Sequence, residues 1–269
     1  MHPIERLRAV ARASSISPTL AVQETATAMA AVANDPFALV TAARRMIDRH
    51  PAAAPLWWFA SRVLTAADPR AEARRAAEEI GEDRTAVELA HALPDGATVT
   101  VLGWPEVVAA ALVRRGDVEV RVVDVHGEGS AFASRLQRYD IAAIDVPPEA
   151  VGAVAASSEL VLLEAEAMGP TAVLARSGSR AAAAVARHAG VAVWAAAGVG
   201  RALPAQMWDA LVRRAGLEDE PWDADDELVP LDLVDQVATP RGICSVTDAL
   251  YDIDCPVAPE LLVDRRDPG

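Results

Sequence analysis

The segment Arg176-Ser177-Gly178-Ser179 places one cation and three small residues between an apolar run and a helical pattern that reaches Gly190. Arginine offers a planar fork of N–H donors that fits phosphate oxygens, and Gly178 permits close approach of the backbone. Ser179 is predicted to cap the helix, whose first free N–H groups and positive dipole end favour an anion. The segment therefore predicts a phosphate site; a capped helix with a solvated arginine is the alternative.

A pair of carboxylates precedes this segment, at Glu164 and Glu166. They follow the apolar run Leu160–Leu163, and residues two apart on a strand point to the same face. Two carboxylates held together raise the pKa of one of them, which is useful for acid–base catalysis. The alternative is that both acids lie in water at the end of a strand. A further cation, Arg201, follows Gly198-Val199-Gly200 and is a candidate for the mouth of a cleft.

Composition excludes several classes of chemistry. The chain has 269 residues and a net charge of −14, which argues against general nucleic-acid binding. All 25 basic residues are arginine, so neither a lysine Schiff base nor the lysine of a P-loop is available. Cys244 and Cys255 lack metal-ligand spacing, and Gly198–Leu203 lacks the third glycine of a dinucleotide fingerprint. We therefore expect no metal and no cofactor.

The setting follows from the same composition. Every apolar run is interrupted before the ~20 residues that a membrane span needs, so no membrane contact is expected. The opening residues lack the apolar core of a signal peptide, which predicts a cytoplasmic protein. The abundance of alanine and arginine reflects GC-rich coding and suggests a bacterial source.

The elements that must position these residues fall into two halves. Residues 1–93 show helical spacing, with capping residues before proline at Ser17-Pro18, Asp35-Pro36 and Asp68-Pro69. We expect four or five packed helices there. Leu93-Pro94-Asp95-Gly96 is a turn-forming cluster, so residues 94–269 are predicted to form a second domain.

The second half alternates short apolar strands with helices. The predicted strands are Thr98–Leu102, Val118–Asp124, Ile141–Asp145, Leu160–Glu164, Ala172–Ala175 and Val191–Ala195. Helices are predicted to begin near Pro105, Gly129, Pro148 and Ser179. This rhythm is typical of an α/β fold with a Rossmann-like, mostly parallel sheet covered by helices on both faces. Ligands of such sheets bind at the carboxyl ends of the strands, which directs attention to Gly103-Trp104 and the other strand ends.

The order of these segments resembles the initiation factor 2B alpha/beta/delta family, which includes methylthioribose-1-phosphate and ribose-1,5-bisphosphate isomerases. The similar segments are His50–Leu64, Thr98–Val108, Glu159–Arg180 and Val229–Val246. Each motif is short, and their collinear order carries the resemblance. It implies a helical domain followed by a Rossmann-like domain, with dimers formed through the latter.

The resemblance also implies roles for single residues. Gly103 stands where the isomerases have a catalytic cysteine, and Glu166 stands where they have an aspartate. The isomerases' Lys-Ile-Gly-Thr turn aligns with Arg176–Ser179. His50 and His126 each replace an arginine, so both contacts are expected to be weak and pH-sensitive. Trp104 either stacks on a base or sugar face or packs against the protein.

Three hypotheses follow. The first is a protein that binds a phosphorylated sugar or nucleotide at the interdomain cleft and lacks the usual isomerase chemistry, because Gly103 has no titratable group. The second is an active aldose–ketose sugar-phosphate isomerase, an intramolecular oxidoreductase that uses Glu166. The third is a non-catalytic homodimeric scaffold or regulatory protein.

Overall fold

The structure is a computed structural model that describes residues 18–217 and 222–263. Its N-terminal part is helical, with α2 (Pro18–Val32), α3 (Pro36–Arg49), α4 (Ala54–Thr65), α5 (Pro69–Gly81) and α6 (Thr85–Ala92). The Asp35 and Asp68 carboxylates each accept two backbone N–H bonds at the starts of α3 and α5, at 3.0–3.1 Å. Both predicted caps are confirmed; Ser17 lies outside the described residues.

The second half alternates strands and helices. Its helices are α7 (Glu106–Arg115), α8 (Gly129–Gln137), α9 (Val151–Ser157), α10 (Ser179–Ala189), α11 (Ala205–Ala215), α12 (Val246–Tyr251) and α13 (Pro259–Leu262), with short 3₁₀ turns at Pro148–Ala150 and Leu231–Leu233. Its strands are β1 (Thr98–Leu102), β2 (Glu119–Val123), β3 (Ala142–Val146), β4 (Leu160–Glu164), β5 (Ala167–Met168), β6 (Ala172–Arg176), β7 (Ala192–Ala196), β8 (Asp226–Pro230), β9 (Gln236–Thr239) and β10 (Gly242–Cys244).

The main sheet has seven strands in the order β10-β9-β7-β4-β1-β2-β3, and every pair is parallel except β10–β9. The predicted α/β fold is confirmed. The chain starts in the middle at β1, moves outward to β3, and then crosses to β4 on the other side. The strand order therefore reverses between β1 and β4, and in open α/β sheets ligands bind in the crevice at such a point.

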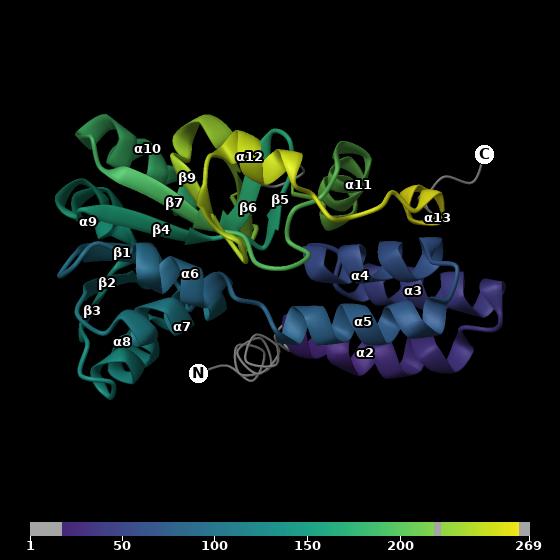
Figure 1. Cartoon of the computed structure of the whole chain (residues 1–269). Coiled ribbons are helices and arrows are strands. Elements are labelled where there is room, and N and C mark those ends of the chain that lie inside the picture. Colours follow the sequence, from purple (N-terminus) through teal and green to yellow (C-terminus); the bar gives the residue numbers. More distant parts are fainter. Residues whose placement is uncertain (1–17, 218–221, 264–269) are drawn as a thin grey trace, which may run out of the picture.

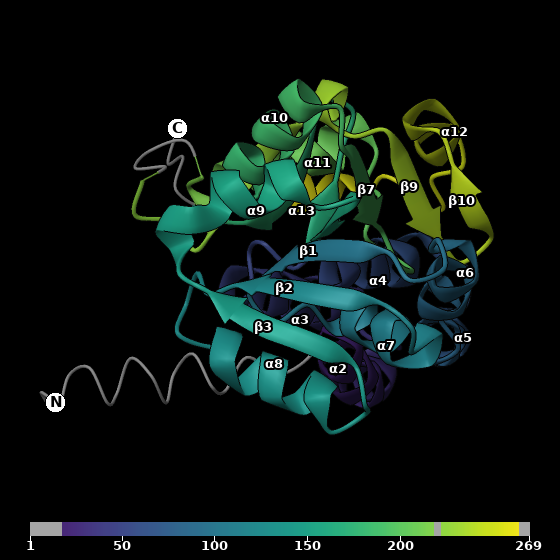
Figure 2. The same cartoon turned by 90° about the vertical axis from the view of Figure 1, so that its left-hand side faces the viewer.

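Helices cover this sheet from two sides. One core joins the sheet to α6, α7 and α8, and another joins it to α9, α10 and α12. The two groups lie on opposite sides of the strands in Figure 1. Figure 2 views β1, β2 and β3 face on, and none of the described helices stands in front of β2 and β3. On β3, the side chain of Ile144 is accordingly 58% exposed.

A second, antiparallel sheet of three strands has the order β5-β6-β8. The predicted strand at Ala172–Ala175 is present, but it belongs to this sheet and not to the parallel one. Alternate residues of β6 enter different cores: Leu174 packs with the helical bundle, and Val173 and Ala175 pack with the sheet and α10. Because side chains alternate along a strand, β6 links the two halves.

The C-terminal residues return to the helical bundle and lie against α4, α3 and α11 (Figure 1). We call residues 252–263 the C-terminal strap. Its apolar residues Cys255, Ala258 and Leu261 are buried in the core that also holds α3, α4 and α5. Burial raises the pKa of the Cys255 thiol to about 12, so this thiol is an unreactive part of the core.

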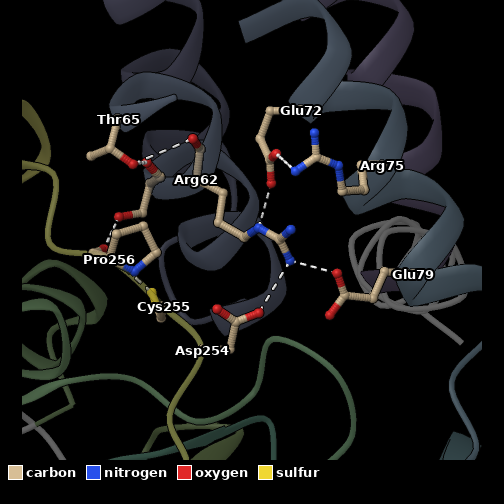
Figure 3. Close-up of polar contacts among 9 residues, drawn as sticks. Arg62, Thr65, Glu72, Arg75, Glu79, Asp254, Cys255 and Pro256 are labelled. Atoms are coloured by element: carbon tan, nitrogen blue, oxygen red, sulfur yellow. Dashed lines mark hydrogen bonds and ion pairs between the residues drawn. The ribbon is translucent and has the colours of Figure 1, made fainter. Parts of the chain in front are cut away.

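Arg62 of α4 fastens the strap to the bundle (Figure 3). Its guanidinium contacts Glu72 and Glu79 of α5 at 2.6 Å each and Asp254 of the strap at 3.3 Å. The guanidinium carbon also lies 4.8 Å from the centre of the Trp58 ring, a cation–π contact. One partly buried cation thus connects α4, α5 and the end of the described chain.

No helix in the described part of the chain combines the length and the apolar character needed to cross a membrane.

Candidate functional site

Gly103 directly follows β1 and lies where three strand ends come together. It is buried and has φ +61°, a backbone conformation that favours glycine. A Cβ placed on it would lie 3.4 Å from Val125 Cγ2, after β2, and 3.9 Å from Arg176 Cγ, at the end of β6. The glycine that aligns with the isomerases' cysteine and the arginine of the predicted phosphate turn are therefore neighbours.

Glu164 ends β4 and is paired with a buried cation. Its Oε1 lies 3.1 Å from Arg201 Nη2, and the two side chains are 6% and 5% exposed. Its Oε2 accepts the backbone N–H of Val108 in α7 at 3.0 Å. Burial raises the pKa of Glu164 despite Arg201, and the nearby Glu166 raises it further. Glu164 thus lies in the protein interior and not in water, and Arg201 lies beneath the surface with it.

Glu166 lies between two guanidinium groups. Its Oε2 is 3.6 Å from Arg201 Nη1, and its Oε1 is 4.0 Å from Arg176 Nη2. Its side chain is 21% exposed. The structure brings together Glu164, Glu166, Arg176 and Arg201, which the sequence had singled out separately. Both oxygens of Glu166 therefore face guanidinium groups of the cluster.

Asp226 of β8 joins this cluster and was missed by the sequence analysis. Its Oδ1 lies 3.1 Å from Arg176 Nη1, and Arg176 is its direct partner in the β6–β8 register. Burial raises the pKa of Asp226 to about 7, and the repulsion from Glu166 and Asp225 adds to this effect, so together they outweigh Arg176. The acidic run 218–227 is typical of a solvated loop, but residues 226–227 start a strand, and residues 218–221 lie outside the described range. The apolar pair Leu228-Val229 directly after the acids is the signal that indicates a strand here.

The start of α10 differs from the prediction in one respect. Gly178, with φ +94°, is the N-cap, and Ser179 is 2% exposed and makes no capping hydrogen bond. The cap comes from another strand, because the Glu227 carboxylate accepts the backbone N–H of Arg180 at 2.9 Å. The Ser177 N–H donates to the backbone oxygen of Asp225 at 3.0 Å. A carboxylate of this chain therefore holds a place near the helix start where the sequence predicts an external anion.

His126 follows β2 and lies at the edge of the same cluster. Its Nε2 lies 3.2 Å from the backbone oxygen of Asp225. Trp104 packs on Phe132 of α8, with ring centroids 5.4 Å apart, and Arg135 lies 5.6 Å from its ring. These contacts agree with the packing interpretation of Trp104 and give its ring partners within the sheet half.

His50 is placed elsewhere. It ends α3, is exposed, and lines a surface cavity of about 510 Å³ in the helical bundle together with Glu24, Arg45 and Arg49. The structure therefore groups His50 with the bundle and not with Arg176.

The turn Gly198–Gly200 connects the cluster to the helical half. The carboxylate of Asp83 accepts the N–H of Val199 at 2.9 Å, and a Cβ on Gly198 would lie only 2.3 Å from Asp83 Oδ2. A Cβ on Gly200, which has φ +74°, would lie 2.9 Å from the Trp58 ring of α4. These two glycines are needed because a helical-half carboxylate and an indole pack against the backbone just before Arg201.

The electrostatic balance of the cluster is slightly acidic. Two guanidinium groups, Arg176 and Arg201, face three carboxylates, those of Glu164, Glu166 and Asp226. Burial opposes the charge of both arginines, but the surrounding carboxylates outweigh it and raise their pKa values. Within the described ranges, no group of three or more His, Cys, Asp or Glu residues is arranged to hold a metal ion. The chemistry that the arrangement supports is recognition of a charged group by Arg176, which is 33% exposed.

Solved structures similar to this chain define its fold. The crystal structure of translation initiation factor eIF-2B from Pyrococcus horikoshii OT3 has a TM-score of 0.73 and 14% identity, over 92% of this chain and 98% of that one. The crystal structure of eIF2B beta from Chaetomium thermophilum has a TM-score of 0.74 and 17% identity, over 97% and 94%. The tetrameric eIF2B-beta2-delta2 complex from C. thermophilum gives 0.71 and 20%, over 92% of each chain.

No protein-family model and no curated protein sequence matches the chain. The structural likeness nevertheless spans nearly the whole length of both partners. The chain is an α/β protein with the fold of the initiation factor 2B subunits, as the order of its segments predicts. Its helical region and its parallel sheet are arranged as in these eIF2B structures.

Proposed function

We propose that the chain is a non-catalytic protein of the initiation factor 2B type, which binds a phosphorylated sugar or nucleotide at Arg176 and does not turn it over. The observation that carries this proposal is the proximity of Gly103 to Arg176, whose Cγ would lie 3.9 Å from a Cβ placed on the glycine. The cation that would hold a phosphate is present, and beside it the residue that aligns with the isomerases' thiol has no side chain. We also propose a cytoplasmic location in a bacterium.

The loss of chemistry follows from the remaining groups. An aldose–ketose isomerisation needs a group that moves a proton between two carbons, and one such group contributes roughly 10²–10⁴-fold. Glu164 is held by Arg201 and by the N–H of Val108, so it has no free position for a substrate. Each oxygen of Glu166 already faces a guanidinium, at 3.6 Å from Arg201 and 4.0 Å from Arg176, so a substrate would have to compete with both arginines for this carboxylate.

The test combines binding with turnover. Ribose 5-phosphate and nucleoside monophosphates should raise the melting temperature of the wild-type protein, and Arg176→Ala should abolish the rise. Arg180→Ala is the matched control, because it removes an arginine side chain four residues away and keeps the backbone N–H that Glu227 accepts. NMR of incubations with ribose 1,5-bisphosphate and methylthioribose 1-phosphate should show no ketose. Ketose formation that Glu166→Gln abolishes would establish the active isomerase instead.

A second function, a homodimeric scaffold, is favoured by one observation. None of the described helices covers one face of β2 and β3 (Figure 2). Ala142 and Ile144 of β3 are exposed. Glu119 and Arg121 of β2 lie opposite these two residues, and an uncovered face with apolar side chains beside charged ones is a typical interaction surface. A similar fold occurs in a tetrameric complex of eIF2B subunits. Light scattering should then show a dimer that Ile144→Asp dissociates, while Phe37→Asp, which changes an exposed residue of the helical bundle, leaves it intact.

A further inference from the structure

The guanidinium of Arg176 already has an anionic partner within the chain. Asp226 lies opposite it in the antiparallel β6–β8 register, so both side chains leave the sheet on the same face. Their closest atoms, Nη1 and Oδ1, are 3.1 Å apart, with the side chains 33% and 15% exposed. An oxyanion that binds Arg176 must therefore share or replace this carboxylate.

The charges around the pair oppose a second anion. Glu166 approaches Arg176 from the connection after β4 at 4.0 Å, and Asp225 and Glu128 add negative charge from the residues just before β8 and α8. His126 contacts the backbone oxygen of Asp225. The other cation of the cluster, Arg201, is held by Glu164. With Asp226 ionised, an incoming dianion meets a net negative surrounding, which is repulsive in a partly buried site.

A proton on Asp226 changes both the charge and the hydrogen bonding. A neutral carboxyl group no longer holds the guanidinium by charge, and its O–H becomes a donor that an oxyanion can accept. Burial raises the pKa of Asp226 to about 7, so the proton is available near neutral pH. The Glu227 carboxylate stays on the N–H of Arg180, which keeps the backbone of the turn in place.

We propose that Asp226 is a proton-controlled gate of the oxyanion site: its carboxylate occupies Arg176 in the unliganded protein, and a phosphate-like anion takes that place together with a proton. This inference rests on the proposed function, since it concerns the same arginine. The inference adds two things to that function. Asp226 is the residue that competes with the anion for Arg176, and protonation of Asp226 is the condition under which the anion binds. The site then binds one anion and one proton as a unit.

Sulfate is the probe that tests the gate, because its charge stays constant over the range in which Asp226 titrates. Isothermal titration between about pH 6 and about pH 8.5 should give a dissociation constant that rises about tenfold per pH unit above about pH 7. Asp226→Asn, which has the same shape and no charge, should bind sulfate with little dependence on pH. Asp225→Asn and His126→Gln are matched controls from the same corner, and both should keep the pH dependence.

A second measurement needs no variant. Titrations at about pH 8 in buffers of different ionisation enthalpy should show about one proton taken up per sulfate bound. A pH-independent affinity of the wild-type protein, a slope that survives in Asp226→Asn, or binding without proton uptake would each overturn the gate and leave the anion site standing. If neither the wild-type protein nor Asp226→Asn binds sulfate at any pH, the proposed anion site itself fails, and the gate with it.

Discussion

Arg201 and Glu164 form an ion pair inside the protein, with Nη2 and Oε1 3.1 Å apart and side chains 5% and 6% exposed. Arg201 follows β7 and Glu164 ends β4, and these two strands are neighbours in the sheet. The pair therefore lies at the carboxyl edge of the sheet, directly behind Glu166. It fixes the loop that carries the turn Gly198–Gly200 to the strand that carries the acidic residues.

Removal of one partner of this pair should destabilise the protein strongly. Arg201→Met leaves Glu164 buried without its cation, which costs about 3–5 kcal/mol of unfolding free energy. The double variant Arg201→Met/Glu164→Leu removes both charges and should recover most of the loss. Urea denaturation of the three proteins measures this. A loss below about 1 kcal/mol in the single variant would contradict the burial described for the pair.

Gly200→Ala should destabilise the protein more than Gly96→Ala, although both glycines have a positive φ angle. Gly200→Ala combines a left-handed residue, which costs about 1–2 kcal/mol, with a Cβ 2.9 Å from the Trp58 ring, which adds about 1–3 kcal/mol. Gly96 has φ +66° and open space around it, so Gly96→Ala should show only the first cost. Thermal unfolding distinguishes the two; equal losses would mean that Trp58 moves aside freely.

The contacts of Arg62 should differ in strength according to their burial (Figure 3). Arg62→Met leaves Glu72, 9% exposed, with only the exposed Arg75, and should cost about 3 kcal/mol or more. Asp254→Asn changes a carboxylate that is 74% exposed and should cost about 0–1 kcal/mol. Hydrogen exchange should show faster exchange in the C-terminal strap of Arg62→Met than in Asp254→Asn. The reverse order would mean that Asp254 is the stronger attachment.

Asp226 should make the folded protein less stable as the pH rises from about 4 to about 7. Its folded pKa, about 7, lies above that of an unfolded aspartate, so the folded state binds the extra proton in this range. The contribution is complete below about pH 4 and is lost as the pH passes 7. Asp226→Asn should therefore gain stability relative to the wild type by a few kcal/mol between about pH 4 and pH 8. A constant difference across this range would show that Asp226 titrates normally.

The sequence predicts the centre of the fold better than its edges. Thr98–Leu102 and Leu160–Glu164 are apolar runs because both faces of these central strands are covered, and both runs coincide with strands in the structure. The strands β9 and β10 are only four and three residues long and lie at the sheet edge, where polar residues such as Gln236 are exposed. Their patterns are too short to detect from one sequence.

The candidate site divides in a similar way. The sequence identifies Arg176, Glu164 and Glu166, because their positions follow from where strands end. It does not identify Asp226, because a run of acidic residues is usually solvated and its contact with Arg176 spans 50 positions. The residue that caps α10 is missed for the same reason, because it comes from a distant part of the sequence. A local pattern indicates Ser179, and the side chain that fills the role is Glu227, which arrives through the β6–β8 pairing.

The C-terminal strap has a consequence for how the chain can mature during its synthesis. The helical bundle is made first, yet part of its core consists of Cys255, Ala258 and Leu261. The ribosome synthesises those residues only after both sheets have been made. Until then, the apolar side chains of α2–α5 that pack against the C-terminal strap remain exposed. A fragment that ends before residue 252 should consequently expose that surface and bind chaperones, although it contains every helix of the bundle and every strand of both sheets.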